Sequence, residues 1–134
     1  MNTIIENEVR EQYLEFITVL NQTDAQKWSE FYSKKNFLSA FLSTDFYDNR
    51  QKFVDVITEY FSMRESQTIE PQSYKITAIS DDLVLITSNE IAVMKLKTGG
   101  KVKAIHTFSL IWFKEENEWK IVHSHESWID EVID

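Results

Sequence analysis

Apolar side chains recur every three or four positions in the first half of the chain, the spacing of one buried face of an α-helix. The first stretch follows Thr3-Ile4-Ile5-Glu6, a capping-box pattern that predicts a helix start. Shorter helices are predicted after Asp24 and after Asp48 or Asn49, side chains suited to an N-cap. Their apolar faces consist of Ile5, Val9, Tyr13, Phe16, Ile17 and Leu20 in the first helix, Trp28, Phe31 and Tyr32 in the second, and Phe53, Val54, Ile57, Tyr60 and Phe61 in the third.

Strand-like alternation replaces the helical period in the second half of the chain. Residues 37–43 predict a short first strand that ends in a turn at Ser43-Thr44-Asp45. After a linker that contains Pro71, the only proline, four more strands are predicted at about 73–80, 83–96, 102–114 and 118–128. The short connections between them, such as the one at Gly99-Gly100, predict an antiparallel meander. The pattern is typical of one α+β domain over residues 1–134, with its helices grouped on one side of the sheet.

Composition narrows the classes of function. The 134 residues contain no cysteine, which excludes disulfide scaffolds, cysteine-ligated metals and cysteine nucleophiles. Fourteen Lys and Arg against 22 Asp and Glu give a net charge of −8, which opposes binding to nucleic acid or to an anionic membrane. A start without a basic, apolar leader and the lack of cysteine predict a cytoplasmic protein. At 43% hydrophobic residues, the chain has ample material for a core.

The strongest candidates for chemistry are the histidines near the end of the chain. Strict alternation in the last strand places His123 and His125 on the face of Trp119 and Ile121, opposite Glu126. A histidine in a semi-apolar cavity can transfer protons near neutral pH. We therefore predict His125 as the acid or base, with Asp45 or Glu90 as its carboxylate partner. The structural alternative is an imidazole that only satisfies a core hydrogen bond.

Other side chains could complete such a pocket. The predicted lining comprises Trp28, Tyr32, Tyr47, Tyr60, Glu90, His106, His123 and Trp128. Buried tyrosines need polar partners and so tend to border a cavity, although the aromatic residues could also simply fill the core. A three-histidine metal site is an alternative with little support, because no carboxylate pattern accompanies the histidines. We therefore predict neither a metal nor a cofactor.

Three segments carry a resemblance to a known family. The family's terminal hairpin is similar to Phe108–Lys114 together with Glu118–His125. Its strand, turn and helix resemble Leu42-Ser43-Thr44-Asp45 and the helix that follows from Asn49. The start of its second helix resembles Asp24–Trp28. Together they resemble the SnoaL-like branch of the nuclear transport factor 2-like superfamily over nearly the whole chain. The resemblance implies a cone, in which a strongly curved antiparallel sheet wraps around three N-terminal helices and leaves a pocket at the wide end.

The resemblance also implies candidate residues and two classes of function. It points to Asp45, His123 and His125, and it implies a homodimer formed through the convex sheet face. One function is a site for a small apolar or aromatic molecule, with isomerase, cyclase or dehydratase chemistry if it is catalytic. The other is a non-catalytic dimeric association or binding domain. Because a fold locates a site without naming a reaction, the sequence leaves this choice open.

Overall fold

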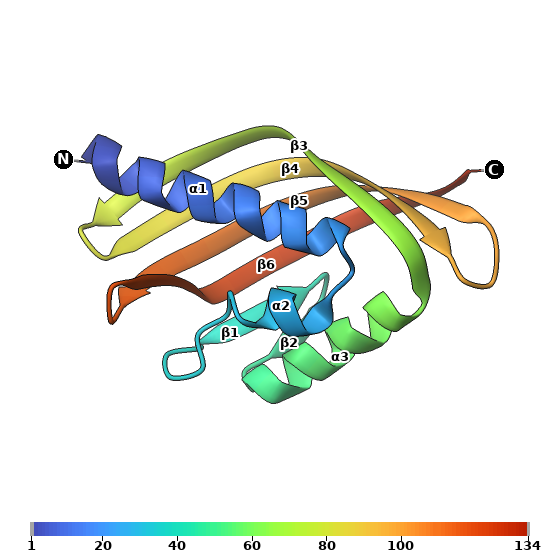
Figure 1. Ribbon diagram of the computed structural model, residues 1–134, viewed down its shortest axis with the longest axis horizontal. Coiled ribbons are helices and arrows are strands. Elements are labelled where there is room, and N and C mark those ends of the chain that lie inside the picture. Colours follow the sequence, from blue (N-terminus) through green and yellow to red (C-terminus); the bar gives the residue numbers. More distant parts are fainter. Residues whose placement is uncertain (1, 134) are drawn as a thin grey trace.

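One curved sheet and three helices make up residues 2–133. The computed structural model describes residues 2–133, so the two end residues of the predicted 1–134 domain lie outside it. The helices are α1 (Asn2–Asn21), α2 (Ala25–Ser29) and α3 (Arg50–Ser62), and the strands are β1 (Ser39–Leu42), β2 (Asp45–Tyr47), β3 (Arg64–Ser80), β4 (Leu83–Leu96), β5 (Lys101–Glu115) and β6 (Glu118–Ile133). Figure 1 shows the sheet bending around the helices. The predicted α+β cone is confirmed.

Two of the three helices, α2 and α3, begin where their capping residues predict, whereas α1 already includes Asn2 and so begins before the predicted cap at Thr3. The Asp24 carboxylate accepts a hydrogen bond from the Lys27 backbone N–H at 3.0 Å, and the Asn49 side chain accepts one from Lys52 at 3.0 Å. In α1, the periodic positions Val9, Tyr13, Phe16, Ile17 and Leu20 are all buried. The helix therefore packs its predicted face against the concave side of the sheet.

The sheet is larger than predicted at both ends. Its strand order is β2-β1-β6-β5-β4-β3, with β1 parallel to β6 and all other neighbours antiparallel. Asp45, predicted to lie in a turn, begins the short strand β2, and the predicted linker after α3 is the first part of β3. Pro71 fits within β3 because that strand lies at the edge of the sheet and its ladder is interrupted between Pro71 and Ser73.

A β-bulge in β6 determines which side chains face the helices. Ile111 of β5 pairs with His123, but the next residue, Trp112, pairs with Ile121, so Val122 is an extra residue. An extra residue reverses the alternation beyond it. Ile121 and Ser124 are consequently both buried, whereas His125 is exposed. The strict alternation predicted for 118–128 is therefore wrong after Val122.

The core lies between the helices and the concave side of the sheet. Its largest fully buried side chains include Trp112, Tyr13, Phe16 and Phe53. The Phe16 and Trp112 rings meet edge to face with their centroids 6.2 Å apart, joining α1 to the middle of the sheet. None of the helices within residues 2–133 is long and apolar enough to span a membrane.

Candidate functional site

A cavity of about 300 Å³ lies between the helices and the concave side of the sheet. This volume is at the lower end of the range of small-molecule sites. Most of the lining is apolar or aromatic, with a few polar groups from three strands. The lining residues are Phe16, Leu20, Trp28, Tyr32, Leu42, Phe53, Ile57, Tyr60, Phe61, Arg64, Gln67, Ile69, Met94, His106, Phe108, Glu126, Trp128 and Asp130.

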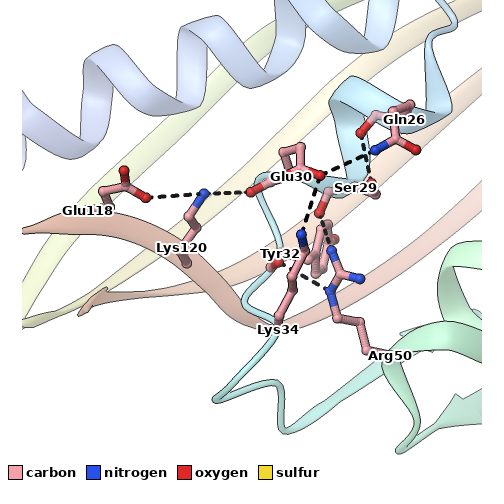
Figure 2. A network of polar contacts seen from close by, with 8 residues as sticks. All are labelled: Gln26, Ser29, Glu30, Tyr32, Lys34, Arg50, Glu118 and Lys120. Atoms are coloured by element: carbon pink, nitrogen blue, oxygen red, sulfur yellow. Dashed lines mark hydrogen bonds and ion pairs between the residues drawn. The ribbon is translucent and has the colours of Figure 1, made fainter. Parts of the chain in front are cut away.

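Polar contacts outside the cavity fix the segment that carries Tyr32. Figure 2 shows Arg50 of α3 donating from Nη2 to the Ser29 carbonyl at 2.7 Å and from Nε to the Tyr32 carbonyl at 3.3 Å. Lys120 of β6 donates to the Glu30 carbonyl at 2.7 Å. Inside, the Tyr32 hydroxyl donates to Ser124 Oγ at 2.9 Å. The short helix α2 and the chain after it are therefore held to both α3 and the sheet, which fixes this wall of the cavity.

A histidine and a glutamate meet on the sheet wall. His106 of β5 pairs across the sheet with Trp128, and Phe108 pairs with Glu126, so His106 and Glu126 are diagonal neighbours on one face. Glu126 Oε2 lies 3.1 Å from His106 Nδ1. Nδ1 is buried but forms no well-directed hydrogen bond. Contacts of this kind often become better aligned when a ligand binds.

Burial shifts both members of this pair toward their neutral forms. It lowers the pKa of His106 to about 4, and the positive charge of Arg64 lowers it further. Burial raises the pKa of Glu126 to about 8, with the charge of Glu90 acting in the same direction and that of Arg64 against it. Near pH 7 the cavity therefore holds a neutral imidazole, able to accept a proton, beside a carboxylic acid able to donate one.

A second buried carboxyl lies behind the pair. Glu90 of β4 pairs with His106 across the sheet and is only 1% exposed. Its Oε2 accepts a hydrogen bond from the Tyr13 hydroxyl at 2.5 Å and lies 3.4 Å from Ser88 Oγ, while Oε1 has no partner among the described residues. Burial raises the pKa of Glu90, and the hydrogen bonds from Tyr13 and Ser88 oppose this. Glu90 does not line the cavity, although its charge acts on Glu126.

Five of the residues predicted for the pocket do line the cavity. They are Trp28, Tyr32, Tyr60, His106 and Trp128. The centroids of His106 and Trp128 lie 6.2 Å apart, so the imidazole borders an aromatic surface. Tyr47 is different, because its half-buried ring packs on Phe53, 5.8 Å away between centroids, and does not reach the cavity.

The predicted pair His125 and Asp45 is not brought together in the cavity. His125 is exposed, and its ring lies beside Phe41, 5.1 Å between centroids. Asp45 is exposed on β2. His123 is half-buried, with Nδ1 2.9 Å from Ser39 Oγ, and burial lowers its pKa. The bulge at Val122 explains the correction for both histidines, because it directs them to the convex face.

The same change of faces separates the three histidines. His106 faces the cavity, whereas His123 and His125 lie on the other side of the sheet, so they cannot share one metal ion. Within residues 2–133, no group of three or more His, Asp or Glu side chains is close enough to hold a metal.

The sequence does not predict several of the residues that line the cavity. Strict alternation places Glu126 on the face opposite the predicted site, and Arg64 falls at the end of the segment with a helical period, just before the predicted linker. A signal for Glu126 is present in the sequence, because the consecutive apolar residues Ile121 and Val122 interrupt the alternation, and an extra residue at a bulge can account for such a break. For Arg64, Gln67 and Asp130 there was no local signal, because their position depends on the long curved course of β3 and β6.

Comparisons with known proteins agree with this architecture. The family model of the SnoaL-like domain matches residues 9–131. No curated protein sequence matches the chain.

Solved structures with little sequence similarity share the fold. A candidate scytalone dehydratase from Novosphingobium aromaticivorans has a TM-score of 0.83 at 7% identity, with 94% of this chain and 85% of that chain covered. A candidate dehydratase of the NTF2-like family from Streptomyces avermitilis has a TM-score of 0.83 at 12% identity, covering 96% and 99%. Hexachlorocyclohexane dehydrochlorinase LinA-type3 from Novosphingobium barchaimii has a TM-score of 0.75 at 7% identity, covering 93% and 87%. At these identities the likeness concerns the fold alone.

Proposed function

The chain belongs to the SnoaL-like domain family, and on that premise we propose that it binds a small, largely apolar molecule in its cavity and transfers protons to and from it. The observation that supports this proposal is the 3.1 Å contact between His106 and Glu126 inside a cavity of about 300 Å³. Two neighbouring titratable groups with oppositely shifted pKa values are a frequent basis for acid and base assignments. The reaction class is an isomerisation, cyclisation or dehydration.

Each member of the pair has a distinct role in such a reaction. Neutral His106 accepts a proton from a carbon next to a carbonyl group, and protonated Glu126 donates a proton to the oxygen on which negative charge develops. The apolar walls, which include Trp28, Phe53 and Trp128, exclude water and favour an apolar or aromatic ligand. The structures named as dehydratases and as a dehydrochlorinase are consistent with eliminations, which also require a proton transfer.

The pH dependence follows from the two roles. His106 must be unprotonated, which requires a pH above its pKa of about 4, and Glu126 must be protonated, which requires a pH below about 8. The rate should therefore be bell-shaped, with its plateau between these values.

The test is deuterium exchange at carbon. Small carbonyl compounds are first screened for binding through the fluorescence of Trp28 and Trp128, both in the cavity wall. Compounds that bind are then incubated with the protein in D₂O, and NMR measures deuterium uptake next to the carbonyl. We expect His106→Asn and Glu126→Gln each to slow the exchange by roughly 100-fold or more, the usual contribution of a general acid or base.

His125→Ala is the matched control, because this histidine lies on the convex face. It should exchange at the rate of the unaltered protein. The proposal is wrong if the His106 and Glu126 variants bind the compounds and exchange as fast as the unaltered protein, or if only His125→Ala is slow.

A second candidate function is that of a homodimeric association domain. On the convex face, Ile105 is 51% exposed and pairs across the sheet with Ile129, which is 75% exposed. Adjacent exposed isoleucines are uncommon away from interfaces and support a contact between two copies. If this face dimerises, Ile129→Asp should convert a dimer into a monomer in analytical ultracentrifugation. A monomer already formed by the unaltered protein at high concentration would exclude the homodimer.

A further inference from the structure

We infer that Arg64 is an anion-binding residue of the cavity and that the ligand carries a carboxylate or a comparable oxyanion at the end of an apolar body. This inference rests on the proposed function, since it concerns the same cavity, and it names the ligand class that the cavity selects. Arg64 is the first residue of β3, directly after α3, where Figure 1 shows the chain turning from the helix into the sheet.

The guanidinium of Arg64 is held on two sides. Its central carbon lies 5.6 Å from the centroid of the Phe61 ring. Nη1 donates to Gln67 Oε1 at 2.6 Å, and Gln67 is itself anchored by donating from Nε2 to the Leu20 carbonyl. An arginine fixed in this way loses little conformational entropy when it binds an anion, because its planar group is already oriented.

Most N–H donors of the guanidinium nevertheless form no hydrogen bond among the described residues. Among residues 2–133, Arg64 forms no ion pair within 4.0 Å, although Glu126 and Asp130 line the same cavity. Of its five N–H groups, the Gln67 contact uses one. A partly buried arginine without a carboxylate partner is costly unless a charged ligand completes it. Two parallel N–H groups match the two oxygens of a carboxylate.

The charge balance of the cavity allows an anion to enter. Glu126 is the carboxyl nearest to the histidine, and it is largely protonated near pH 7, so it does not repel an anion there. Asp130 also lines the cavity but is exposed near the end of β6, and its negative charge acts on Arg64 without forming an ion pair. Arg64 is thus the one Lys or Arg side chain among the lining residues, although the whole chain carries −8.

The remaining walls define the body of the ligand. Phe16, Leu20 and Trp28 from α1 and α2, and Phe53, Ile57 and Phe61 from α3, surround the cavity with apolar surface. An acid with an aromatic or alicyclic body therefore satisfies both parts of the site.

Three probes with one skeleton test the charge preference: 3-phenylpropanoate, 3-phenylpropanamide and 3-phenylpropylamine. Affinity is measured at pH 7 by titration of tryptophan fluorescence and by calorimetry. We expect the unaltered protein to bind the carboxylate at least tenfold more tightly than the amide, and the amine more weakly than either. Arg64→Gln should reduce the carboxylate preference to within twofold while leaving amide affinity unchanged.

Two further variants complete the design. Arg64→Lys keeps the charge but loses the planar pair of donors, so it should retain an intermediate preference and shows that the result does not depend on one variant folding. Lys52→Gln removes an exposed positive charge of α3 outside the cavity and should leave all three affinities unchanged. Equal loss in Arg64→Gln and Lys52→Gln would mean that only net charge matters and would overturn the inference.

The outcomes separate this inference from the proposed function. Binding of the amide as tightly as the carboxylate contradicts the role of Arg64 but leaves a small-molecule site in the cavity. Tighter binding of the amine would assign the charge preference to Glu126 and Asp130 and would also overturn the inference. Absence of saturable binding of all three probes contradicts both proposals.

Discussion

The buried acid Glu126 makes a quantitative prediction about stability. Its folded-state pKa of about 8 lies above its ordinary value of 4.5, so the folded protein holds this proton over a pH range in which the unfolded chain has released it. The resulting stability is fully present below pH 4.5 and is lost as the pH rises through 8. His106 acts in the opposite direction between about 4 and 6.5, because burial lowers its pKa. Above pH 6.5, the change due to this pair therefore comes from Glu126.

The magnitude can be worked out for that upper interval. Each pH unit over which the folded and unfolded states differ by one proton changes the free energy of unfolding by about 1.4 kcal/mol. Allowing for partial ionisation near pH 8, Glu126 lowers the free energy of unfolding by roughly 2 kcal/mol between pH 6.5 and pH 8.5. Glu126→Gln keeps the shape and polarity of the side chain but cannot ionise, so this part of the loss should disappear.

The assay is urea unfolding followed by circular dichroism at pH 5, 6.5 and 8.5. The unaltered protein should lose about 2 kcal/mol more than Glu126→Gln between the two higher pH values. Glu131→Gln removes an exposed carboxylate of the same strand and should keep the slope of the unaltered protein. If Glu126→Gln and the unaltered protein have parallel pH dependences, Glu126 is ionised at its ordinary pKa in the folded state. The acid role assigned to it would then be untenable.

Three further substitutions test other parts of the structure. Tyr13→Phe removes the donor to Glu90 Oε2 and leaves a buried carboxyl less satisfied, so urea unfolding at pH 7 should show a loss of roughly 1–3 kcal/mol; an unchanged midpoint would contradict the buried contact. Asn49→Ala removes the N-cap of α3 and should cost about 1 kcal/mol in the same assay, whereas Asn49→Ser should restore most of it. His125→Ala should change stability by less than about 0.5 kcal/mol and leave ligand affinity unaltered, and a tenfold weaker affinity would return His125 to the site.

Local patterns predict the helices and five of the 18 residues that line the cavity. The buried face of α1 follows from a period that depends only on neighbouring residues, and the caps at Asp24 and Asn49 are equally local. Trp28 and Tyr60 follow from their places on the inner helix faces, where large aromatic side chains are buried. Tyr32 also lines the cavity, but its prediction within the second helix is wrong, because α2 ends at Ser29. The strand β2 and the first half of β3 are not predicted, because short or polar strands gain their stability from partners far along the chain.

The single extra residue in β6 determines which face of the sheet His123 and His125 occupy. With strict alternation, β6 would bury His123 and His125 and would expose Val122. The bulge instead leaves both Ile121 and Val122 buried and moves His125 to the surface. Burying a valine side chain is worth roughly 1.5–3 kcal/mol, whereas burying a polar imidazole without a partner costs energy, so the burial of Val122 in place of His125 favours the bulged register.

The same register determines which side chains of β6 face the cavity side of the sheet. Beyond the bulge, Ser124 and Glu126 face inward, and each meets a partner from elsewhere in the chain: the hydroxyl of Tyr32 and the imidazole of His106. The parallel neighbour β1 supports this choice, since its buried residues Ala40 and Leu42 pair with Ser124 and Glu126. A carboxyl group that enters an apolar wall must either find a cation or remain protonated. His106 with its lowered pKa does not supply the cation, and Arg64 forms no ion pair with Glu126 and only partly offsets the effect of burial on its pKa. The acid character of Glu126 is therefore a consequence of the bulge, and it could not follow from the His-Ser-His-Glu sequence alone.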